Sequence, residues 1–221
     1  TVNSLIAQGA PVSFSLGAIA CAFGILVGIV FGVISAINRG RFPDYLVIIL
    51  SILCVSVPAF VFASLFQYAF GAKLQWLPVA GWKGPVYMVL PCLALGLRLI
   101  AYVARMMRTS MLDVLGQDYI MTARAKGLTS GQVIRRHTIR NAIMPVVSVA
   151  GSMIAGTLVG SFVIENIFNI PGMGKYLVDA VTDNDYTVVL GMTTFYALVL
   201  VVITFIVDIL YVVIDRRVKL D

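Results

Sequence analysis

The chain has 221 residues, of which 60% are hydrophobic and only 12% are charged, and its net charge is +6. Soluble domains carry about 25% charged residues, so this composition excludes an ordinary soluble protein and indicates a membrane protein. The positive charge does not indicate nucleic-acid binding, because the basic residues are divided among segments between apolar blocks and form no continuous basic face.

Five apolar blocks are long enough to cross a bilayer, which takes about 20 helical residues. Pro58 interrupts the second block and predicts a kink there, because proline removes a backbone donor and clashes with the preceding turn. The sequence therefore predicts an all-α membrane protein with about five transmembrane helices in a single domain, residues 1–221. The blocks run approximately over residues 12–37, 45–70, 86–104, 143–164 and 188–214.

The distribution of basic residues predicts the orientation of these helices. All but Lys73, Lys83 and Lys175 of the 16 lysines and arginines fall on one side of the predicted bundle. The positive-inside rule makes that side cytoplasmic, so the N-terminus of this chain is expected outside and its C-terminus inside. An external N-terminus predicts one more transmembrane helix before Thr1, which would give six.

A polar loop, residues 106–142, separates the third and fourth blocks and contains the stretch YIMTARAKGLTSGQ. Gly127 follows a helix-forming run and is placed to end it, and Thr129 with Gln132 matches a capping box that starts a second helix. The loop is thus predicted to form a helix, a glycine turn and another helix. Its pattern alone fits either an ordinary basic loop or a surface that docks on another protein, where the small residues Ala123 and Ala125 would permit close approach.

The segment 165–187 is predicted to lie outside the membrane on the opposite side. Its PGMGKY stretch lacks the spacing of a phosphate-binding loop and has Tyr176 where that loop needs serine or threonine. A turn followed by an amphipathic helix over about 173–181 is predicted instead, and this surface could receive an extracytoplasmic binding protein.

Three ionisable residues fall within or at the end of apolar blocks: Arg98, Glu165 and Asp208. Charged groups inside a membrane are functional candidates, but for Asp208 we favour a structural role as the partner of Arg98 or of an arginine at the cytoplasmic end. Glu165 could line a transport pathway or face an external partner. His137 is the single histidine and the cysteines have no ligand spacing, so neither a metal site nor a catalytic set is predicted.

Several stretches together resemble the binding-protein-dependent ABC import permeases, most closely the dipeptide and oligopeptide branch. These are SMLDVLGQDYI, YIMTARAKGL with RRHTIRNAIMP, VIENIFNIPGMGKYLVDAVTDNDY and VDILYVVIDRRVKL, and they cover nearly the whole chain. The broader family motif, Glu-Ala-Ala followed by glycine, matches literally only at Ala123 and Gly127. The proline that the motif places further on is replaced by Arg140.

The resemblance implies a type I ABC importer permease that moves di- or oligopeptides across the bacterial inner membrane by alternating access. It further implies that the loop docks on an ATPase through a coupling helix, with Gly127 as the turn, Ala123 as the close contact, and surrounding contacts from Tyr119, Arg124, Lys126 and Leu128. The implied partners are a homologous second permease, two ABC ATPase subunits, an extracytoplasmic binding protein and the lipid bilayer. ATP and magnesium would be bound by the ATPases, with no cofactor and no enzymatic activity on this chain.

Other functions fit the same residues. A permease of this branch could carry nickel, haem, glutathione or opines, since cargo is selected largely by the binding protein. A channel or secondary transporter would need no ATPase, but the sequence shows no acid–base relay beyond Arg98 and Asp208 and no inverted repeat. A structural scaffold would leave the glycine-turned basic loop without a purpose. Co-purification of an ATPase would distinguish these classes.

Overall fold

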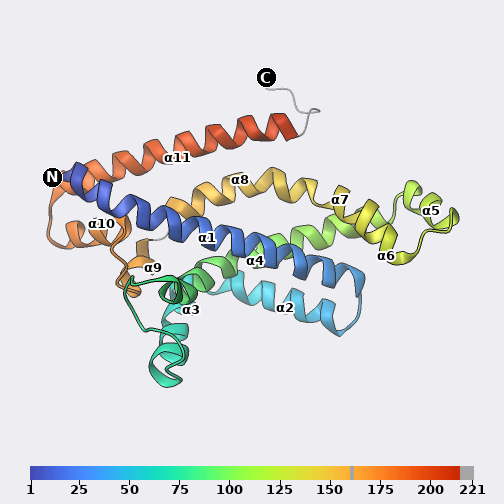
Figure 1. Cartoon of the computed structure of the whole chain (residues 1–221), viewed down its shortest axis with the longest axis horizontal. Coiled ribbons are helices and arrows are strands. Elements are labelled where there is room, and N and C mark those ends of the chain that lie inside the picture. The colour runs from blue at the N-terminus through green and yellow to red at the C-terminus, as the bar shows by residue number, and fades with distance from the viewer. Residues whose placement is uncertain (160–161, 215–221) are drawn as a thin grey trace. The chain divides into compact units, whose positions relative to one another are not determined.

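The computed structural model describes residues 1–159 and 162–214, and within that part of the chain the regular structure is helical throughout (Figure 1). The α-helices are α1 (Val2–Ile37), α2 (Phe42–Ser56), α3 (Ala59–Phe66), α4 (Pro85–Leu115), α5 (Asp118–Ala125), α6 (Ser130–Gln132), α7 (Ile139–Ala142), α8 (Met144–Val159), α9 (Phe162–Ile167), α10 (Met173–Thr182) and α11 (Tyr186–Ile214). Two π-helical segments, η1 (Gln67–Lys73) and η2 (Val133–Thr138), continue α3 and α6.

Three described helices are long and apolar enough to cross a membrane, namely α1, α4 and the Tyr186–Val207 part of α11. The segment from α2 to η1 meets the same criteria only when its two bent halves are taken together, as a broken span or a re-entrant loop. Its break lies at Pro58, whose backbone is extended with ψ 143°, as the sequence predicted. The fourth predicted block forms α8, a helix of 16 residues, and then α9 after residues that lie outside the described part.

The long helices extend beyond the apolar blocks that predicted them. α1 begins at Val2 and contains Pro11, whereas the apolar block begins near residue 12. α4 continues to Leu115, so residues 106–115 belong to this helix and the loop predicted from 106 begins only after it. Hydropathy marks where a chain leaves lipid, but a helix ends only where backbone hydrogen bonding ends.

The described chain divides into two compact units. The first unit comprises residues 1–23, 57–97 and the chain from 151 onward, and the second comprises 24–56 and 98–150. α1 and α4 contribute residues to both units.

In the second unit, α1 and α4 pack closely at small residues. A methyl group added at Gly32 would lie 2.6 Å from the Met107 Cβ and 2.7 Å from the Ala104 carbonyl oxygen. Only glycine allows the two helices to approach so closely. This approach packs α1 against a face of α4 that includes Val103, Ala104 and Met107, each 0% exposed.

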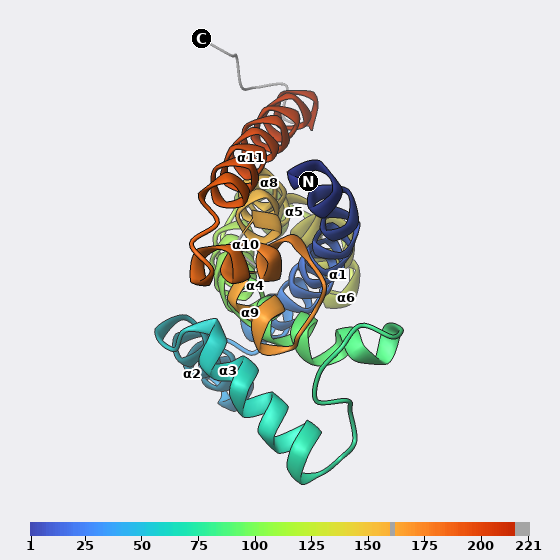
Figure 2. The ribbon, with the colours of Figure 1, turned by 90° about the vertical axis from the view of Figure 1, so that its left-hand side faces the viewer.

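In the first unit, an apolar core joins the beginning of α1, part of α4 and the segment around α9. Its buried members are Leu16, Ala20, Ala63, Leu90, Cys92, Ala94, Leu95, Ile164, Phe168 and Ile170. The loop after η1 is fixed to this core, because the Gly81 N–H donates to the Phe168 carbonyl at 2.7 Å. Figure 2 shows α9 and α10 beside the N-terminal part of α1.

Candidate functional site: the helical hairpin after α4

The hairpin, defined as residues 116–142, begins where α4 ends at Leu115. The Gly116 and Gln117 N–H groups donate to Asp113 and Val114, so the chain turns before α5 starts at Asp118. α5 and the arm formed by α6, η2 and α7 then lie together at the end of the second unit (Figure 1). The predicted helix, turn and helix are therefore present.

A small core holds the two arms together. Ile120 and Ala123 from α5 and Val133 from η2 are buried, with Val114 and Leu128 packed against them. Exposed fractions are 0% for Ile120, 7% for Ala123 and 1% for Val133. The hairpin thus has its own apolar centre, although it is rich in charged residues.

The turn between the arms depends on Gly127. Its φ is +83°, a left-handed conformation that costs other L-residues about 1–2 kcal/mol. The Gly127 N–H donates to the Arg124 carbonyl at 2.9 Å and the Leu128 N–H donates to the Ala123 carbonyl at 3.3 Å. Gly127 therefore ends α5 as the sequence predicted, with no side chain near the site of its missing Cβ.

The second arm starts at the predicted capping box. The Gln132 N–H donates to Thr129 Oγ1 at 3.4 Å, and the Thr129 N–H donates to Gln132 Oε1 at 3.0 Å. The arm then continues through α7 into α8, because the Val147 N–H donates to the Ile143 carbonyl. A hydrogen bond of 2.9 Å from Asn141 Nδ2 to the Tyr119 hydroxyl adds a side-chain link between the two arms.

The prediction that Ala123 provides a close contact to another protein stays a prediction, and the structure places this residue inside the hairpin. Its side chain packs inside the hairpin against Ile120 and Val133, so its small size permits the close packing of the two arms. The outward face of α5 instead presents Met121, 60% exposed, together with the exposed Thr122 and Ala125. Ala123 and Ala125 are two residues apart and therefore lie on different faces of the helix, and the sequence, which offered both for a close approach, did not show which face turned inward.

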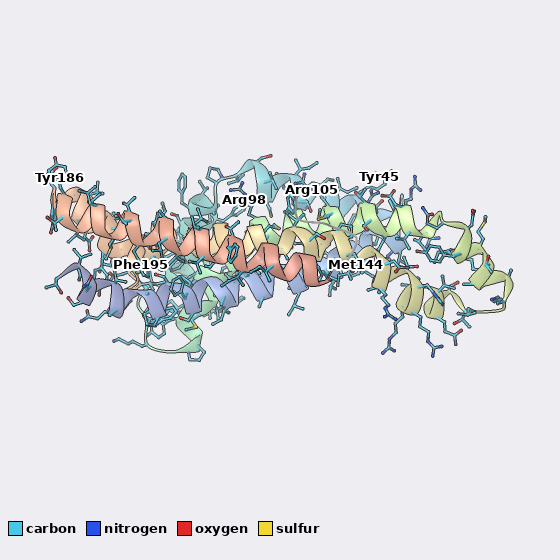
Figure 3. The ribbon with its side chains drawn as sticks, turned by 90° about the horizontal axis from the view of Figure 1, so that it is seen from above. Tyr45, Arg98, Arg105, Met144, Tyr186 and Phe195 are labelled. Carbon is cyan, nitrogen blue, oxygen red and sulfur yellow. The ribbon has the colours of Figure 1, made fainter. Side chains whose placement is uncertain are left out.

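The other predicted members of the loop surface divide by burial. Tyr119, Arg124, Lys126 and Gly127 are exposed, whereas Leu128 is half-buried against the hairpin core. Arg135, Arg136 and Arg140 add exposed positive charge on the second arm. Figure 3 shows long nitrogen-tipped side chains projecting from this end of the molecule. The hairpin therefore offers a basic surface with an apolar residue, Met121, on α5.

In the first unit, Glu165 is 0% exposed and is held by the segment that follows it. Its Oε2 accepts a hydrogen bond of 2.8 Å from the Gly174 N–H, in the first turn of α10. The adjacent Met173 N–H donates to Ser13 Oγ of α1 at 2.9 Å. The carboxylate thus satisfies the N-terminus of the predicted outer helix, which runs from Met173 to Thr182, and this burial does not fit a side chain that faces an external partner.

Arg98 is exposed on α4, and Asp208 lies in α11 with its side chain outside the described residues. A pairing between them stays a prediction. Among the described residues, no three His, Cys, Asp or Glu side chains are grouped in a way that could hold a metal ion.

Sequence reasoning missed the buried ion pair of the second unit. Asp44, 1% exposed, lies in the first turn of α2, and Arg108 lies on α4. The Asp44 carboxylate also accepts hydrogen bonds from Ser35 Oγ and, at 2.8 Å, from the Gly40 N–H. An isolated acid beside an apolar block was the only available signal, and nothing in the sequence connects it to a residue 64 positions away.

Residues 28–220 match the family described as the binding-protein-dependent transport system inner membrane component. The chain belongs to this family. The permease is 46% identical over 220 residues to the dipeptide transport system permease protein DppB of Bacillus subtilis, covering 100% of this chain and 71% of that protein. It is 40% identical over 221 residues to the oligopeptide transport system permease protein OppB of Haemophilus influenzae, covering 99% of this chain and 72% of that one.

Solved structures of ABC importers share the permease's fold. A structure of the MetNI methionine ABC transporter in an inward-facing conformation aligns with a TM-score of 0.74 and 17% identity, covering 96% of both chains. A crystal structure of an amino acid ABC transporter with histidines aligns with a TM-score of 0.73 and 17% identity, covering 98% of this chain and 95% of the other. The permease is thus a multi-pass inner-membrane transport protein with the type I importer fold, as its sequence predicted.

Proposed function

We propose that the permease is the membrane-spanning subunit of an ATP-driven importer of di- or oligopeptides. The relatives that support this cargo are named dipeptide and oligopeptide permeases and are 40–46% identical to the chain over almost its full length. The same level of identity favours peptides over the nickel, haem, glutathione and opine alternatives. A channel or secondary transporter is disfavoured by membership of a binding-protein-dependent family.

The hairpin is the proposed contact with an ATPase subunit. The supporting observation is an exposed α5 face built on a rigid core, with Met121, Thr122 and Ala125 available and Arg124 and Lys126 at its sides. Met121 is apolar and 60% exposed on a hairpin that is otherwise basic, so its side chain is available to another protein. We assign the docking contact to Met121 and its neighbours in place of Ala123.

The assembly contains a homologous second permease, two ABC ATPases and an extracytoplasmic binding protein. ATP and magnesium bind to the ATPases, so no cofactor is assigned to this chain, which carries out no enzymatic step. The hairpin faces the cytoplasm, as the clustering of basic residues favours, and α10 lies on the outer side.

Co-purification with the ATPase subunits tests the proposal. Met121→Asp should abolish ATPase recovery with the tagged permease, because it places an unpaired charge in a contact that is closed to water. Val181→Asp is the matched control, since Val181 is 59% exposed on α10, and it should leave recovery unchanged. Equal recovery of ATPase with Met121→Asp and with the control would overturn the assignment of this face.

A further inference from the structure

One face of α4 carries a row of polar residues that its own unit leaves uncovered. The row, called the polar stripe, recurs at spacings of four, three, four and four residues along the helix. Such spacing places all its members on one side of an α-helix. The polar stripe consists of Arg98, Tyr102, Arg105, Thr109 and Asp113.

The opposite face of α4 is the one that packs within the second unit. Val103, Ala104 and Met107 are each 0% exposed there and meet α1. Arg98, Thr109 and Asp113 on the polar stripe are exposed, and Tyr102 is 40% exposed. Figure 3 places Arg98 and Arg105 along the same side of α4. The polar stripe therefore faces away from the packed part of its unit.

A cavity of about 490 Å³ lies along this stripe. It is lined by Tyr102, Arg105, Met106, Thr109, Ser110 and Asp113 of α4 and by Pro145 at the start of α8. Hydroxyl groups and both signs of charge thus line part of this open hollow, which is large enough for a small polar ligand.

Contact between this face and lipid chains would be energetically unfavourable. Arg98 and Tyr102 lie in the last turns of the apolar block of α4, where a lipid-facing arginine is costly, and Arg105, Thr109 and Asp113 follow that block at its proposed cytoplasmic end. Ionisable residues in spanning helices accordingly face protein or a water-filled space. Two arginines, a tyrosine and a threonine in one row are characteristic of a face that meets water.

We propose that the polar stripe lines the aqueous translocation path of the assembled importer, with Arg105, which lines the cavity, holding the C-terminal carboxylate of the transported peptide. This inference rests on the proposed peptide-import function. A guanidinium matches a carboxylate with two parallel N–H donors, and such charge-assisted hydrogen bonds are worth about 1.5–3 kcal/mol. Asp113 lies eight residues beyond Arg105, about 12 Å along the helix at 1.5 Å per residue, and bears the charge that attracts a peptide's ammonium end.

The first test measures contact with water and needs no peptide. In the complete transporter with Cys21, Cys54 and Cys92 replaced, Tyr102→Cys and Thr109→Cys should react with a membrane-impermeant thiol reagent. Ile49→Cys, on a 56% exposed apolar position of α2, is the control and should react at least tenfold more slowly. Equally slow reaction of all three variants would overturn the aqueous path.

The second test compares uptake of a peptide with a free C-terminus, the same peptide amidated at its C-terminus, and the same peptide acetylated at its N-terminus. The unmodified transporter should move the free peptide about tenfold or more faster than the amide, and Arg105→Gln should bring the two rates within about twofold. Asp113→Asn is the matched control, because it should keep discrimination against the amide and lose discrimination against the acetylated form. Unchanged discrimination against the amide in Arg105→Gln would overturn the role of Arg105.

Two further outcomes would separate a lipid-binding role and a different cargo from the proposal. If Arg105→Gln alters the dependence of transport on anionic lipid in nanodiscs, with no change in peptide discrimination, the arginine binds a lipid headgroup and the proposal is wrong. If no peptide is transported but another cargo is, the peptide function fails, while the thiol reactivity still shows whether the polar stripe meets water.

Discussion

The Arg108 guanidinium donates two hydrogen bonds to the Asp44 carboxylate, from Nε to Oδ1 at 2.6 Å and from Nη2 to Oδ2 at 2.8 Å. With Ser35 and Gly40 as further donors, each carboxylate oxygen accepts two hydrogen bonds. The pair joins the turn between α1 and α2 to α4, one to two turns before α4 ends and the hairpin begins. Because its carboxylate is 2% exposed, this link has little competition from water.

Asp44→Ala is expected to lower the free energy of unfolding by about 3 kcal/mol, since it leaves Arg108 without its counter-charge and two donors without an acceptor. This loss of unfolding free energy is at the low end of the range for buried ion pairs, because the Arg108 side chain is 23% exposed. Thermal unfolding in detergent would measure it, with Arg39→Ala, an exposed arginine nearby, as the control. A loss no greater than that of the control would contradict the finding that the pair stabilises this unit.

Gly32→Leu is expected to separate α1 from α4, because even a methyl group would lie 2.6 Å from the Met107 Cβ. Overpacking of this kind costs about 1–3 kcal/mol or more. Gly131→Ala serves as the control, since open space surrounds its Cβ position and alanine favours a helix. Crosslinking between cysteines introduced into α1 and α4 would follow the separation, and unaltered crosslinking in Gly32→Leu would show that the close approach is unnecessary.

Thr129→Ala is expected to loosen the second arm of the hairpin by about 1 kcal/mol, because the Gln132 N–H loses its side-chain acceptor. Hydrogen exchange of the amides at 130–133 should accelerate about fivefold, the factor that corresponds to this free energy. Thr129→Ser keeps the hydroxyl and should exchange almost as slowly as the unchanged chain. Similar acceleration in both variants would mean that the threonine methyl group, and not the cap, stabilises the arm.

Glu165→Ala is expected to release the start of α10, because the buried Gly174 N–H would lose its acceptor at a cost of about 1–3 kcal/mol. Glu165→Gln retains a carbonyl oxygen and should preserve more of the contact. Proteolysis of the segment around α10 in detergent would report the release, with Asp179→Ala, an exposed change on the same helix, as the control. Equal proteolysis of Glu165→Ala and the control would rule out the anchoring role.

The turn and cap of the hairpin could be predicted because their signals are local. Gly127 and the pair Thr129 and Gln132 act within four residues, where backbone conformation and short hydrogen bonds decide the structure. The same holds for the break at Pro58. The helix predicted over 173–181 agrees with α10 to within one residue at its end.

Helix ends were less predictable than helix positions. The apolar block that ends near residue 104 marks a change of solvent, yet α4 keeps its backbone hydrogen bonds to Leu115. Helix-forming residues continue beyond the end of the apolar block, so a prediction from hydropathy alone makes the helix too short.

By itself, the sequence determined that this protein is helical, lies in a membrane and carries a glycine-turned hairpin, because periodicity, composition and capping are properties of short segments. Only the tertiary structure decided which face of α5 is buried, which side of α4 is uncovered, and that Asp44 meets Arg108. Those outcomes depend on which surfaces pack together, and residues 64 positions apart have no local interaction through which the sequence could reveal their contact.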